Sequence, residues 1–125
     1  MSSAEAKIKQ DLLAEIQILN DNYKILASFV SGVDYDPQTV GNGMQTYKDS
    51  LSRASAYVLA LYNLKGQRVS IPWEQLFTSL DYAIATLSAS ATIKQRDAVR
   101  AILAMSMEQM KQVMSYFAAL KESLQ

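Results

Sequence analysis

The sequence predicts an all-α protein, most simply an antiparallel up-down four-helix bundle that spans residues 1–125 as a single domain. Three observations favour this fold. Apolar residues recur at helical steps of three and four over long stretches. The chain has only four Gly and two Pro, too few for the frequent turns of an all-β protein. Half of the residues are hydrophobic and 19% are charged, as expected of a chain that buries one core.

The first helix is expected from about residue 4 to residue 31. Ser2 and Glu5 have the spacing of a capping box, in which two side chains bond the free N–H groups of a helix start. Gly32 suits the left-handed residue that follows a helix end. The apolar stripe of this helix comprises Ile8, Leu12, Ile16, Leu19, Tyr23, Leu26 and Val30.

The second helix is expected over about residues 37–64. Asp36 and Pro37 are typical of an N-cap followed by the first helical position, and Gly66 provides the stop. Gly41 and Gly43 leave the start open, because each glycine costs about 1 kcal/mol in a helix. The helix begins either at Pro37 or near Gly43. Its stripe comprises Val40, Met44, Tyr47, Leu51, Ala54, Val58 and Leu61.

A third helix is expected to follow Ser70 as N-cap, with Pro72 in its first turn. No Gly or Pro follows, so a break before the fourth helix depends on residues 88–92, where Thr92 and Gln95 have capping-box spacing. The alternative is one long continuous helix, completed by oligomerisation. The apolar stripe of the third helix comprises Trp73, Leu76, Leu80, Ile84 and Leu87. That of the fourth helix comprises Val99, Leu103, Met110, Val113, Phe117, Leu120 and Leu124.

Three basic residues crowd the start of the fourth helix, where positive charge opposes the helix dipole: Lys94, Arg96 and Arg100. In an up-down bundle, the loop between the first two helices lies at the same end and carries Asp34 and Asp36. We therefore expect the basic side chains to pair with that loop. An acidic partner or a nucleic acid is the alternative use of these charges.

The chain contains no His and no Cys. This absence excludes haem ligation by His and zinc sites built from Cys or His. It also excludes Ser-His or Cys-His nucleophiles and the Glu-x-x-His di-iron sites of helical bundles. The acidic residues are scattered; Asp11 and Glu15 lie four apart but off the stripe, and both are expected in solvent. We expect no cofactor, no metal and no enzymatic activity. Twelve basic residues balance twelve acidic ones, which argues against nucleic-acid binding.

The least charged stretch, residues 75–93, contains only Asp81 and is rich in Ser, Thr and Ala. This composition indicates a buried or interface helix, and we expect no membrane span. Residues 1–10 lack the apolar centre of a signal peptide. With the absence of Cys, this favours a cytoplasmic protein.

Three features exceed what a generic bundle needs. They are the segments 54–64 and 75–93, which together contain only Asp81 as a charged residue, a group of four methionines, and seven tyrosines. The methionines are Met105, Met107, Met110 and Met114, of which the last three share one helical face. Flexible thioethers and half-polar aromatic rings suit adaptable interfaces, although core filling is the favoured explanation of the methionines, because Val113 and Phe117 lie beside them. The candidate interaction surface comprises Tyr57, Leu59, Tyr62, Phe77, Tyr82, Ala85, Ala89, Met107, Met114 and Tyr116.

These features predict a non-enzymatic protein–protein interaction or assembly module, such as an adaptor, chaperone, inhibitor or structural subunit. Its partner is expected to be another protein or a second copy of the chain. The alternative is a binder of a small apolar ligand, which requires a pocket between the helices.

Overall fold

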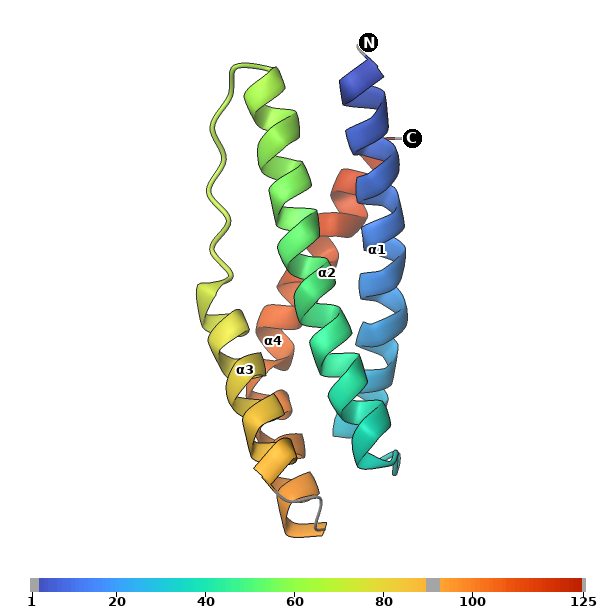
Figure 1. Ribbon diagram of the computed structural model, residues 1–125, viewed down its shortest axis with the longest axis vertical. Coiled ribbons are helices and arrows are strands. Elements are labelled where there is room, and N and C mark those ends of the chain that lie inside the picture. Colours follow the sequence, from blue (N-terminus) through green and yellow to red (C-terminus); the bar gives the residue numbers. More distant parts are fainter. Residues whose placement is uncertain (1–2, 90–92, 125) are drawn as a thin grey trace.

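The computed structural model describes the backbone of residues 3–89 and 93–124, and the side chains of residues 3–88 and 96–124. Four helices pack in sequence order around a ring, so that each contacts its neighbours in the chain and α1 also contacts α4. They are α1 (Ser3–Val30), α2 (Pro37–Leu64), α3 (Glu74–Ala89) and α4 (Ile93–Leu124). Figure 1 shows that they alternate in direction, which confirms the predicted four-helix bundle.

The first two helices end in the same way, at the glycines that the sequence indicated. Gly32 and Gly66 both have positive φ angles, 111° and 69°. Around Gly32, the N–H of Val33 donates to the carbonyl of Ser28 and the glycine N–H donates to that of Phe29. Equivalent bonds close the end of α2. This double pattern satisfies carbonyls that have no partner within the helix.

The start of α2 confirms the cap predicted at Asp36. The Asp36 carboxylate accepts a bond from the backbone N–H of Thr39 at 2.7 Å, and Pro37 is the first helical residue. This bond holds the pKa of Asp36 below its usual value. The helix therefore begins at Pro37 and includes both Gly41 and Gly43. Gly43 is buried against α1, and a Cβ built there would lie 3.5 Å from Leu26.

The start predicted for the third helix is wrong, because α3 begins at Glu74 and not after Ser70. The residue before a proline is disfavoured in the helical region, so Pro72 keeps Ile71 out of a helix. Residues 67–73 form a connection without helical structure. The first helical bond across the new start runs from the Phe77 N–H to the Trp73 carbonyl at 3.1 Å.

As a result, α3 is half as long as α4, with 16 residues against 32. In Figure 1, the connection descends from the end of α2 to the start of α3 partway along the bundle. One part of the bundle therefore has four helices, and the other has three helices and the connection. Val69 and Ile71 of this connection pack against the core.

Helices α3 and α4 are separate and antiparallel, so the continuous-helix alternative is wrong. Gln109 of α4 donates to Gln75 of α3 at 3.3 Å, which fixes their register. The predicted cap at Thr92 and the one at Ser2 lie outside the described residues.

The core follows the predicted stripes closely. Six members of the stripes are only partly buried, namely Ile8, Tyr23, Val30, Ile84, Leu120 and Leu124. Two apolar residues that the stripes omitted, Phe29 and Ala83, are fully buried.

One acidic residue contradicts the sequence-based expectation. Glu15 is only 6% exposed. Arg53 of α2 donates to both carboxylate oxygens at 2.6 and 3.0 Å, and the Ser50 hydroxyl lies 3.1 Å from the Glu15 carbonyl oxygen. Glu15 is tolerated at the α1–α2 interface because a bidentate guanidinium neutralises it. Asp11 is partly exposed and pairs with Lys7.

The glycines give a matched pair of substitutions. Gly41→Ala should raise the free energy of unfolding by about 1 kcal/mol, because the position is helical and the added methyl would make an ordinary contact with Leu87 at 3.5 Å. Gly32→Ala should lower it by about 1 kcal/mol or more, because its φ is positive. Urea denaturation followed by circular dichroism measures both. No gain from Gly41→Ala would indicate that α2 begins after this residue.

Candidate interaction surface

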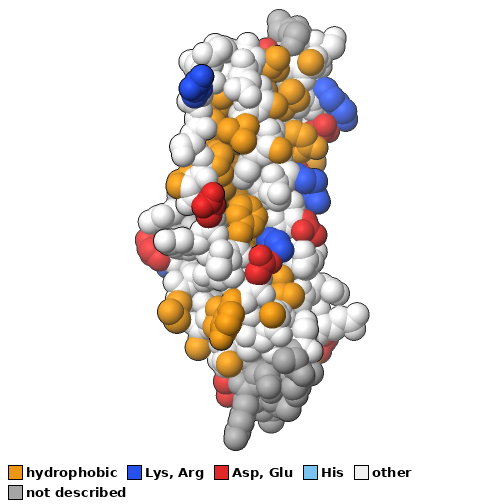
Figure 2. Space-filling view, turned by 60° about the vertical axis from the view of Figure 1, so that its left-hand side comes forward, with side chains coloured by type: hydrophobic (Ala, Val, Ile, Leu, Met, Phe, Trp, Pro, Cys, Tyr) orange, Lys and Arg blue, Asp and Glu red, His pale blue; other side chains and the backbone are white. Residues whose placement is uncertain are grey.

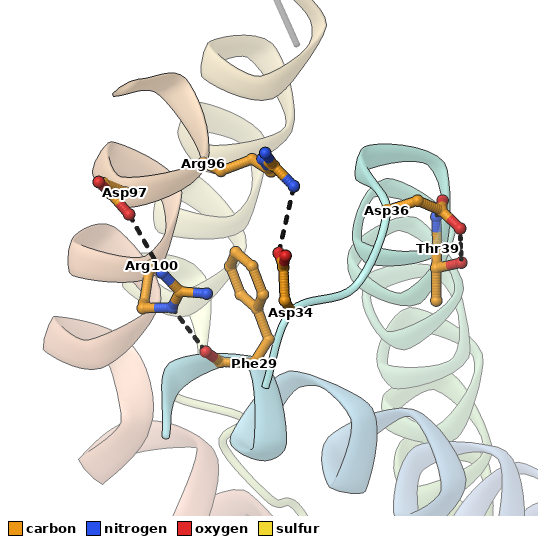
Figure 3. A network of polar contacts seen from close by, with 7 residues as sticks. All are labelled: Phe29, Asp34, Asp36, Thr39, Arg96, Asp97 and Arg100. Atoms are coloured by element: carbon orange, nitrogen blue, oxygen red, sulfur yellow. Dashed lines mark hydrogen bonds and ion pairs between the residues drawn. The ribbon is translucent and has the colours of Figure 1, made fainter. Parts of the chain in front are cut away.

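Of the basic residues at the start of α4, Arg96 pairs with the loop between α1 and α2 as predicted, whereas Arg100 pairs with Asp97 of its own helix. Arg96 bonds Asp34 at 3.1 Å, and Arg100 bonds Asp97 at the same distance (Figure 3). Asp36 is occupied in capping α2 and takes no part in this pairing. The side chain of Lys94 lies outside the described set.

Arg100 also closes the end of α1. Its Nε donates to the Phe29 carbonyl at 2.7 Å, and its guanidinium lies 4.5 Å from the centre of the Phe29 ring (Figure 3). A cation at a helix C-terminus interacts favourably with the dipole and with free carbonyls. A charge that is unfavourable for α4 thus stabilises α1. Arg100 therefore joins α4 to α1, and Arg96 joins α4 to the loop that follows α1.

An aromatic cluster lies where the connection enters α3. The Trp73 ring is 5.5 Å from that of Tyr116 and 5.3 Å from that of Phe117, measured between centroids. The Tyr116 hydroxyl is buried and has no hydrogen-bond partner among the described residues. Burial raises the pKa of Tyr116, and the neighbouring Tyr62 adds to the shift. These rings anchor the connection against α4.

Three of the methionines predicted as one face of α4 are directed toward the core. Met110 is fully buried, and Met107 and Met114 pack against the core. The Tyr47 hydroxyl donates to the Met114 sulfur at 3.6 Å, and burial raises the pKa of this tyrosine. Core filling accounts for this group. Met105, in contrast, is 85% exposed.

Met105 borders an open groove on the outer side of the α3–α4 pair, with a volume of about 710 Å³. Tyr82, which is 65% exposed, contributes from α3. The antiparallel register places Ile102 and six polar side chains along the rest of the groove. The lining residues are Glu74, Gln75, Thr78, Ser79, Tyr82, Ile102, Met105, Ser106 and Gln109.

The groove is almost uncharged. Glu74, at the first residue of α3, is the one charged residue of its lining. Asp81 is paired with Lys48, and this links α3 to α2. Figure 2, in which the side of the molecule with the connection and α3 comes forward, shows hydrophobic side chains gathered between scattered charges. We call the groove and its rim the α3–α4 face.

The structure divides the ten predicted surface residues into different environments. Tyr82 and Ala85 are exposed on α3, and Leu59 is 39% exposed on α2. The partly buried members pack against the core: Tyr57, Tyr62, Phe77, Met107, Met114 and Tyr116. The side chain of Ala89 is not among those described. The uncharged segments of α2 and α3 are thus covered only in part within one chain.

Sequence reasoning included Met105 in the methionine group but did not place it at a groove, and it did not single out Ile102 or Gln109. Met105, Ile102 and Gln109 line the groove with Tyr82. One signal was present: Met105 lies two residues after Leu103 of the stripe, so a large apolar side chain points away from the core. The pairing of Gln75 with Gln109 required the register of the two helices.

Within residues 3–89 and 93–124, no group of three or more acidic side chains could hold a metal ion. No helix in the same part of the chain is long and apolar enough to cross a membrane. Comparisons with protein families, with characterised proteins and with solved structures gave no match. Fold and surface chemistry are therefore the basis for proposing a function.

Replacing Arg100 tests its role as a bridge between α1 and α4. Arg100→Met retains the side chain's apolar stem but removes the bonds to Phe29 and Asp97. We expect a loss of about 1–2 kcal/mol in the free energy of unfolding, from the charged hydrogen bond and the ring contact. Lys111→Met, an exposed change on the same helix, is the control. Equal values from urea denaturation of the two variants would contradict this role.

Proposed function

We propose that this chain is a non-enzymatic protein–protein interaction or assembly module, and that the α3–α4 face is its binding surface. The observation that carries the proposal is the exposure of Tyr82 and Met105, at 65% and 85%, beside a groove. Scattered single apolar residues are normal on a protein surface, but these two border one groove. Tyrosine and methionine are also enriched at protein interfaces.

The groove is suited to helix packing. Two antiparallel helices form its walls, and a third helix laid between them would contact both. Gln75 and Gln109 provide donors and acceptors without net charge. An adaptor, chaperone, inhibitor or structural subunit could use such a face. We further propose a cytoplasmic location, which the absence of Cys favours.

A small apolar ligand is the second candidate occupant. The groove volume of about 710 Å³ falls within the range of roughly 300–1,000 Å³ typical of ligand sites. The groove is largely open to solvent, however. Ligand pockets usually enclose most of the ligand surface. This openness favours a macromolecular partner.

Affinity capture from the native source, followed by mass spectrometry, tests the proposal. The wild-type chain should retain a defined protein, which includes an untagged second copy. Tyr82→Lys should lose it, because the change removes the ring and places a charge on the α3–α4 face. Thr46→Lys, at an exposed position of α2, adds the same charge elsewhere. Equal retention by all three baits, or none by the wild type, would contradict the proposed function.

A further inference from the structure

We infer that the partner of the α3–α4 face is a second copy of this chain, in a two-fold symmetric dimer. This inference rests on the proposed function and names the occupant of the groove. Three properties of the face support it: its shape, its lack of charge and its area.

The first property is that the face carries a protruding side chain and a hollow next to each other. Met105 is 85% exposed, and the groove that it borders has a volume of about 710 Å³. In a two-fold interface, the same patch is used on both subunits, so a protrusion on one copy must meet a recess on the other. Met105 of each copy can enter the groove of the other. The flexible thioether adapts to the recess that it enters.

The second property is the near absence of charge. Near a two-fold axis, side chains meet their own copies, so a charge there would face an identical charge. Among the lining residues of the groove, only Glu74, at the first residue of α3, is charged. Outside the lining, Glu108 of α4 is exposed, and Asp81 is paired with Lys48. A strongly charged partner would lose hydration here without gaining an opposite charge. An identical uncharged face carries no such cost.

The third property is the extent of the face. The 16 residues of α3 make it roughly 24 Å long, and two packed helices make it about 20 Å wide. Two copies would bury on the order of 1,000 Å² in total, close to the lower limit for specific interfaces. Interfaces below about 1,200 Å² include many weak and transient complexes, so we expect a weak dimer. Dimerisation should therefore depend on protein concentration.

Sedimentation velocity over a range from low-micromolar to near-millimolar protein tests the inference. The wild type should shift from monomer to dimer. Met105→Glu should weaken the dimer at least about tenfold, because it places like charges in the interface. The matched control is Ala118→Glu, which adds the same charge at an exposed position on the same helix beyond the groove. Circular dichroism verifies that both variants are folded.

Spin labels then locate the interface, since the chain has no natural cysteine. Labels on Glu108→Cys, at an exposed position of α4 within the span that borders the groove, should lie closer together in the dimer than labels on Gln17→Cys of α1. Labels closer at Gln17, or a dimer that Met105→Glu leaves intact, would overturn the inference. A wild type that remains monomeric would also overturn it. In that case, capture of a different protein that Tyr82→Lys abolishes would still uphold the proposed function.

Discussion

The packing of Trp73 against α4 is the contact on which the other features of this bundle depend. Pro72 prevents a helix from starting earlier, and Trp73, the last residue of the connection, packs against the rings of Tyr116 and Phe117. Each such aromatic pair contributes about 0.5–1.5 kcal/mol beyond the burial of its surface. This anchor fixes where α3 begins and therefore which part of α4 it covers.

The position of α3 in turn determines the exposed surface. Because α3 spans only half the length of α4, the two form a short antiparallel pair, and the α3–α4 face lies on its outer side. Polar contacts that join other helices of the bundle lie outside the α3–α4 face. Glu15 and Arg53 connect α1 to α2, and Arg100 connects α4 to the end of α1. Charges are thus used within the bundle, and the groove of the α3–α4 face has one charged lining residue, Glu74.

The sequence was sufficient for the fold and for three of the helix ends. Asp36, Gly32 and Gly66 act through local backbone geometry, which a sequence pattern can reveal. The sequence was insufficient where the environment of a side chain depends on residues far away in the chain. Glu15 appeared solvated because its partners come from α2, 35 and 38 positions further along the chain. The groove likewise depends on the register of α3 against α4, and periodicity alone could not show which face of α3 the rest of the chain leaves open.

The role of Trp73 can be measured directly, because it is the only tryptophan in the chain. Equilibrium unfolding in urea should be followed by tryptophan fluorescence and, on the same samples, by far-ultraviolet circular dichroism. If the Trp73 anchor holds the bundle together, the two transitions coincide, as in a cooperative two-state process. A fluorescence transition at lower urea, with the helical signal retained, would show that the bundle persists without the anchor and would contradict this account.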